Sequence, residues 1–287
     1  MIKTTIGFIS ITPQTFTNAT KFRAIRRLLI EKFNEMSVYC FDNVPDNVFK
    51  GIKFGSENTN KANSTRAGII VAHKTAVPST KHRITPLLRW RSHERKILLA
   101  RLDSFLAAAP FSESIFPKVK NQLVSLYEQI RKNHMPLAHA LAYHPTNYAL
   151  QVPSPPRYFI SALKEKVSRT SSKTLYFHSS DDRDRAYLLL NSSFAYWWWR
   201  VNDGGMTLSE RTLLSLPHLV FNMDRHLVCE LEKSEKTSKV YKKNAGKMIE
   251  NVKHPLELIK RVNHLVCPDY ETELVGTHSN SSISESI

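Results

Sequence analysis

The first 78 residues alternate between strand-like and helix-like segments, and this alternation restricts the start of the chain to an α/β fold. Runs rich in apolar and β-branched residues at 6–12, 37–41 and 67–73 predict three strands. Between the first two runs, apolar side chains recur at helical spacing, at Phe22, Ile25, Leu29 and Phe33. The basic side chains expected on the other face are Arg23, Arg26, Arg27 and Lys32. We therefore expect a helix with one buried apolar face and one exposed basic face.

Three strands and one long helix are too few for a complete doubly wound domain. The sequence therefore predicts that residues 1–78 form only the C-terminal part of a partial Rossmann-like sheet. The remaining strands would have to come from elsewhere.

The alternation of strand-like and helix-like segments changes after residue 78, where we place a domain boundary. A strand is expected at 84–90, helices at 92–105 and 118–132, a Pro-rich extended stretch at 143–160, a strand at 174–178 and a helix at 182–200. The basic stretch 233–247 is expected to be a linker or exposed turn, and a helix should follow Pro255. Residues 79–270 are thus predicted to form a second, mixed α/β domain, with a disordered tail at 271–287.

The chain has 41 Lys and Arg residues against 25 Asp and Glu, a formal net charge of +16. Such an excess favours a polyanion as partner, nucleic acid above all, although a basic surface can also serve solubility alone. An RNA-binding protein is a further alternative that rests only on charge and aromatic content.

Other features of the sequence argue against several classes of site. Cys40, Cys229 and Cys267 are few and far apart, which disfavours a disulfide framework or a zinc ribbon and suits the reducing cytoplasm. His134, His139 and His144 recur every five residues, a spacing that does not direct ligands at one metal. No apolar run approaches the roughly 20 residues of a membrane span, so we expect a soluble cytoplasmic protein with no membrane partner.

An ordered series of short motifs links the two predicted domains. GFISITPQTFTNATKFRAIRRLL is followed by SVYCFDNVPDNVFKG, and then by LLRW, FPKV, PPRYFISAL, KTLYF and NSSFAYWWWRVNDGG. In this order they resemble the gamma-type adenine-N6 DNA methyltransferases of combined restriction-modification enzymes, over about residues 5–265. The resemblance implies that 1–78 are the last strands of the methyltransferase domain and that 79–270 are its target-recognition domain.

The chain lacks the motifs that bind the methyl donor and catalyse methyl transfer in this family. The Gly-rich methyl-donor loop and the tetrapeptide Asn/Asp-Pro-Pro-Tyr/Phe are both missing, and Ser154–Arg157 (SPPR) is a structural segment because it has no side-chain amide for adenine. We therefore expect no catalytic residue and no cofactor in this chain alone. A partner chain would supply the missing motifs and bind S-adenosylmethionine, and the substrate would be double-stranded DNA with a flipped adenine. The alternative is a non-catalytic DNA-binding remnant or a specificity subunit for a nuclease.

The resemblance assigns one base-stacking candidate. Phe49 matches the family aromatic that packs against the flipped adenine, although an ordinary core phenylalanine would look the same in the sequence.

The aromatic block at 196–199 covers a full helical turn, so its side chains are expected to point in different directions. Trp197 and Trp198 are expected in the core. Tyr196 and Arg200 are expected to be exposed to DNA, and Asn202 and Asp203 are candidate readers of base edges.

A basic strip flanks the extended stretch and the strand after it. Its members are Arg157, Lys164, Lys166, Arg169 and Lys173, with Tyr158 among them. We interpret the strip as a phosphate-tracking surface, with a solvated charged face as the alternative.

Overall fold

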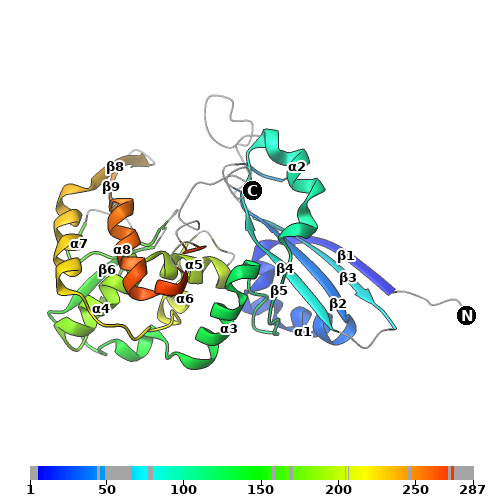
Figure 1. Ribbon diagram of the computed structural model, residues 1–287, viewed down its shortest axis with the longest axis horizontal. Helices are drawn as coiled ribbons and strands as arrows, with labels where there is room; N and C mark the ends of the chain where they lie inside the picture. The colour runs from blue at the N-terminus through cyan, green and yellow to red at the C-terminus, as the bar shows by residue number, and fades with distance from the viewer. Residues whose placement is uncertain are drawn as a thin grey trace, which may run out of the picture. The chain divides into compact units, whose positions relative to one another are not determined.

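The computed structural model of the chain describes residues 6–43, 46–48, 66–76, 80–154, 156, 159–167, 171–203, 205, 207–244, 247–270 and 273–274. These residues form two units of mixed α/β structure. Among the described residues, unit 1 comprises those up to Gln129 together with Arg200–Asp203 and Gly205, and unit 2 comprises the others. Each unit is described by itself, and Figure 1 labels their elements.

Unit 1 is built on a five-stranded mixed sheet whose strand order is β1-β3-β2-β4-β5. Its strands are β1 (Ile6–Pro13), β2 (Glu35–Phe41), β3 (Ala67–Lys74), β4 (Lys81–Leu88) and β5 (Ala107–Ala108). Strand β3 is antiparallel to both β1 and β2, whereas β2 and β4 are parallel. The predicted boundary at residue 78 therefore falls inside this sheet, because β4 pairs with β2.

The helices of unit 1 are short. They are η1 (Gln14–Thr17), η2 (Thr20–Phe22), α1 (Arg23–Lys32), η3 (Ser92–Glu94), α2 (Arg95–Ala100), η4 (Leu102–Phe105), η5 (Asn121–Leu123) and the first part of α3 (Val124–Asn133). The helix expected at 92–105 is thus three consecutive short helices.

Strand β2 lies at the centre of the sheet and packs against apolar residues on both faces. On one face Met36, Val38 and Cys40 pack with Leu29 of α1. On the other face Phe41 packs with residues of the η3–η4 region, including Leu98. Burial on both faces is typical of a central strand, and it fixes the position of the residues that follow β2.

Helix α1 departs from its expected amphipathic pattern at Arg26, which is buried, while Ile25 is exposed. The Arg26 guanidinium donates to the carbonyl oxygens of Phe16, Ala19, Glu113 and Ser114. These carbonyls lie outside the sheet, in η1 and in the irregular segments at Ala19 and at 113–114, and the buried guanidinium supplies them with a charged donor. The expectation that Arg26 lies on the exposed face is wrong.

Unit 2 contains two separate two-stranded antiparallel sheets and most of the longer helices. Its strands are β6 (Ala149–Pro153) with β7 (Ser172–Tyr176), and β8 (Lys239–Asn244) with β9 (Lys247–Val252). Its helices are η6 (Leu137–Ala140), α4 (Ser180–Asn191), α5 (Ser193–Asn202), α6 (Glu210–Leu214), α7 (Arg225–Thr237), α8 (Leu256–Val266) and η7 (Pro268–Tyr270), with the last residues of α5 assigned to unit 1.

The long helix expected at 182–200 is interrupted at Ser192, where the backbone is extended. The Ser193 N–H donates to Oδ1 of Asn263, and the Asn263 amide donates to the Ser193 hydroxyl. A buried asparagine of α8 thus supplies both partners at the start of α5.

The stretch 233–247 is not a linker or an exposed turn. Its first residues complete helix α7 and the remainder enters the β8–β9 hairpin.

Candidate functional site at the carboxyl end of strand β2

Four polar residues follow β2 and are almost completely buried: Asp42, Asn43, Asp46 and Asn47. Buried polar groups require partners inside the protein, so their presence indicates an organised region rather than a solvated turn. The carboxyl ends of strands are also where ligands of open α/β sheets gather. This region is therefore the leading candidate site in unit 1.

The Asp42 carboxylate is held between two guanidinium groups. Arg66 Nε donates to Oδ1 at 2.7 Å and Arg89 Nε donates to Oδ2 at 2.9 Å. Burial alone would raise the pKa of this carboxyl, but Arg66, Arg89 and the nearby Arg200 outweigh burial and hold the pKa well below its usual range. Asp42 therefore stays ionised at any pH at which the fold is stable.

The Asp42–Arg66 pair joins two positions that are 24 residues apart in the sequence. Arg66 is further fixed because its carbonyl accepts from the Gln14 N–H and its Nη1 donates to the Gly205 carbonyl. On the other side, Arg95 donates to the carbonyl of Asn47. Both ends of the connection from β2 to β3 are therefore anchored to the sheet. Phe49, the base-stacking candidate in this connection, lies outside the described residues.

Positive charge exceeds negative charge in this part of unit 1. Lys118 is buried, and its ammonium donates to the Val201 carbonyl and the Thr17 hydroxyl. Burial lowers the Lys118 pKa to about 8, and the positive charge of Arg200 contributes to this shift. Several basic side chains and the Asp42 carboxylate are thus buried close together at this end of the sheet.

The candidates at the end of α5 are buried within the protein. Tyr196 and Arg200 are almost inaccessible, so the expectation that they are exposed is wrong, whereas the expected burial of Trp197 and Trp198 is confirmed. Asn202 accepts a hydrogen bond from the Tyr127 hydroxyl. Its neighbour Asp203, the other candidate base reader, accepts from the Gly205 N–H.

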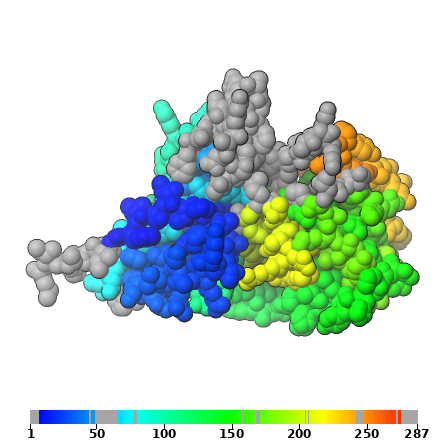
Figure 2. Space-filling view, turned by 180° about the vertical axis from the view of Figure 1, so that it is seen from behind, coloured from blue at the N-terminus to red at the C-terminus, as the bar shows by residue number. Residues whose placement is uncertain are grey.

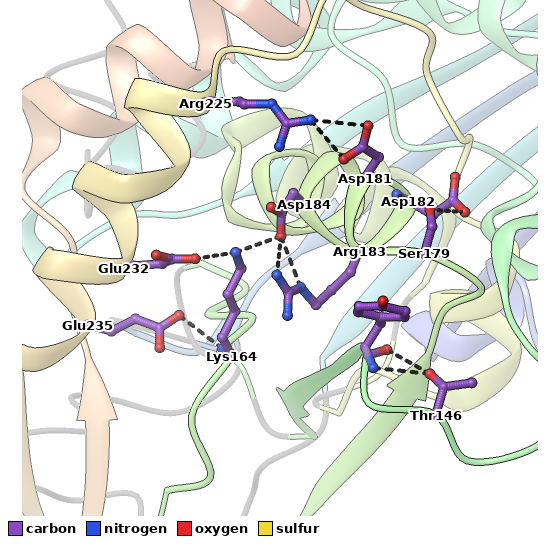
Figure 3. Close-up of polar contacts among 11 residues, drawn as sticks. Thr146, Lys164, Ser179, Asp181, Asp182, Arg183, Asp184, Arg225, Glu232 and Glu235 are labelled. Carbon is purple, nitrogen blue, oxygen red and sulfur yellow. Dashed lines mark hydrogen bonds and ion pairs between the residues drawn. The ribbon is translucent and has the colours of Figure 1, made fainter.

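Lys164, a member of the predicted basic strip, is enclosed by carboxylates. Its ammonium lies 2.6 Å from Asp184 of α4 and also pairs with Glu232 of α7, and its side chain is only 11% exposed (Figure 3). Its backbone N–H donates to Glu235. An ammonium neutralised by two carboxylates is a poor phosphate contact, so we do not include Lys164 in a DNA surface.

The other members of the strip give less information. Lys173 lies on β7 and pairs with Glu210 at 3.2 Å in a partly exposed contact. Lys166 is exposed. Arg157, Tyr158 and Arg169 lie outside the described residues, so their role stays a prediction.

Strand β1 is at the edge of the described sheet and pairs only with β3 among the described residues. Ile9 and Ile11 on one face of β1 are 72% and 60% exposed. On the opposite face, Phe8 is partly exposed, and Ile25 and Leu28 of α1 are also exposed. Figure 2 shows β1 and α1, in blue, at the surface of unit 1. Unit 1 thus has a long strand edge with apolar side chains uncovered on both faces.

The β8–β9 hairpin is the feature of unit 2 that sequence reasoning missed. The runs KVYKKN and KMIENV flank Ala245 and Gly246, a two-residue connection with a glycine, but neither run alternates between apolar and polar residues, so the sequence carries only a weak hairpin signal.

Within the described part of the chain, no cluster of three or more His, Cys, Asp or Glu residues is placed to hold a metal ion. Of the helices that the structure describes, none has both the length and the apolarity needed to cross a membrane. No family model and no curated protein matches the sequence.

Proposed function

We propose that this chain recognises DNA sequence for an adenine-N6 DNA methyltransferase system, with the donor loop and the catalytic tetrapeptide supplied by another polypeptide segment. The observation that carries the proposal is the open edge of β1. A strand of eight residues that leaves Ile9 and Ile11 in solvent is a site for strand pairing and aggregation unless another segment covers it. The missing strands of a Rossmann-like methyltransferase sheet would provide that cover.

The polar cluster at the end of β2 supports a role for the following connection in substrate binding. Asp42 and Arg66 fix its ends, so a side chain such as Phe49 is carried between anchored points. In this proposal Phe49 stacks on the extruded adenine and restores part of the stacking that the base loses on leaving the duplex.

Selection from a random pool of DNA duplexes tests the recognition function directly. The purified chain should enrich one motif that contains an adenine, and should bind it roughly 10³-fold or more tightly than unrelated duplex DNA at the same salt concentration. Enrichment of no motif, or tighter binding to RNA of matched length, would overturn the proposal.

The role of Phe49 is tested separately. Phe49→Ala should weaken the fluorescence change of 2-aminopurine at the target adenine in the assembled enzyme, while Phe49→Trp should retain it.

A further inference from the structure

The β8–β9 hairpin forms a two-stranded sheet of its own, paired from Lys239 with Val252 to Asn244 with Lys247. Its base is anchored in unit 2, because Val252 is buried and its carbonyl accepts from the Ser161 hydroxyl. The Lys253 N–H also donates to the Ser238 carbonyl. Figure 1 shows the hairpin at one end of unit 2, next to the ends of α7 and α8. The two strands thus extend from a fixed base.

Away from its base, the hairpin exposes large apolar side chains. Tyr241 and Met248 are 61% and 60% exposed, and Val240 is also exposed. Tyr241 is paired with Glu250 and Lys243 with Met248, so Tyr241 and Met248 are diagonal neighbours on one face of the ribbon. Neither side chain contributes to the core. Two large exposed side chains on the same face therefore indicate a contact surface.

The same ribbon is strongly basic. Residues 239–252 contain Lys239, Lys242, Lys243 and Lys247 and a single acidic residue, Glu250, which gives 4 − 1 = +3. Lys239 and Glu250 form an ion pair at 2.8 Å near the base. The register places the other three lysines toward the end that joins the strands. Positive charge is therefore concentrated where the hairpin is farthest from its anchor.

We propose that the β8–β9 hairpin enters the major groove of duplex DNA, with Tyr241 and Met248 against the base edges, and that the net positive charge of the ribbon favours the polyanionic duplex. The inference rests on the proposed DNA-recognition function and names the element that carries it out. A two-stranded ribbon has the width that the major groove admits. Apolar side chains there can contact thymine methyl groups, and the ribbon's net charge of +3 is attracted to the phosphate backbone.

The test measures duplex DNA binding by fluorescence anisotropy between 50 and 300 mM salt for three variants of the full chain. Lys242→Ala/Lys243→Ala removes two positive charges from the ribbon, which should lower the slope of log affinity against log salt by about 1.8 if both charges neutralise phosphates. The affinity should then fall roughly 30-fold at 0.15 M salt, about 5-fold for each lysine. Tyr241→Ala/Met248→Ala should weaken binding about 10-fold and leave the salt slope unchanged, because no counterions are involved.

Tyr143→Ala is the matched control, since Tyr143 is 96% exposed on another loop of unit 2. It should leave affinity within about two-fold of the native chain. Circular dichroism melting of all three variants reports whether they remain folded. Hairpin variants that bind with native affinity and slope would overturn the hairpin proposal and leave DNA recognition standing. If the native chain binds no duplex DNA, the proposed function fails instead. Hairpin-dependent binding to anionic phospholipid vesicles in place of DNA would also overturn the inference.

Discussion

Replacing Asp42 with asparagine should strongly destabilise unit 1, because the change keeps the shape of the side chain and removes its charge. The native carboxylate is 2% exposed, and its partners Arg66 and Arg89 are 8% and 13% exposed. Breaking a buried ion pair from one side leaves uncompensated buried charge, which typically costs about 3–5 kcal/mol. Here two guanidinium groups lose an ion-pair partner at once, so we expect the upper part of that range.

Urea denaturation of the full chain, followed by tryptophan fluorescence, measures this free energy of unfolding. Glu113→Gln is the control, because it removes the charge from an exposed pair with Arg23 and should change stability little. The double variant Asp42→Asn/Arg66→Gln should be less destabilised than the sum of the single changes, since both remove the same interaction. The reasoning is refuted if Asp42→Asn costs no more than Glu113→Gln, or if the two changes at Asp42 and Arg66 are additive.

Three further predictions concern other parts of the chain. Burial lowers the pKa of His254 to about 4 from an ordinary 6.5. Between these pH values the unfolded chain binds one more proton than the folded chain, so the free energy of unfolding should fall by about 3 kcal/mol as the pH drops through this window. In urea unfolding, His254→Asn should no longer show this pH-dependent loss. Arg26→Met should cost about 2–3 kcal/mol in thermal or urea unfolding because it strips turn carbonyls of a charged donor, whereas exposed Arg27→Met should cost almost nothing. Hydrogen exchange of the isolated chain should be faster in β1 than in β2, and equal protection of the two strands would show that another segment already covers β1.

The strands of unit 1 could be predicted because their apolar runs are short and bounded by turn residues. The same local rules failed at Arg26. Its guanidinium is buried because it donates to the carbonyls of Glu113 and Ser114, which are far away in the sequence. A pattern of helical spacing records which side chains are apolar. It does not record where distant turns require a donor.

The candidate site shows the same limit. The aromatic block of α5 was expected to expose Tyr196 because a helix usually has one buried face. In the structure the block from Tyr196 to Trp199 is buried on every side. A central helix of this kind cannot be distinguished from an amphipathic one in ten residues when most of them are large and apolar. Asp42, by contrast, gave no signal at all, because its importance depends on Arg66, just before β3, and Arg89, just after β4.

The uncovered side chains of unit 1 also restrict what kind of segment can complete its sheet. The other edge strand, β5, has only two residues, so β1 is the edge with length enough for a full strand to pair. The register places Phe8 on the same face as Met36 and the α1 contacts, and Ile9 and Ile11 on the opposite face. A lone strand added to β1 would satisfy its backbone but leave apolar side chains exposed on both faces. Under the proposed function, the segment that covers β1 would therefore have to bring a strand together with layers above and below it, as a doubly wound α/β domain does and a bound peptide does not.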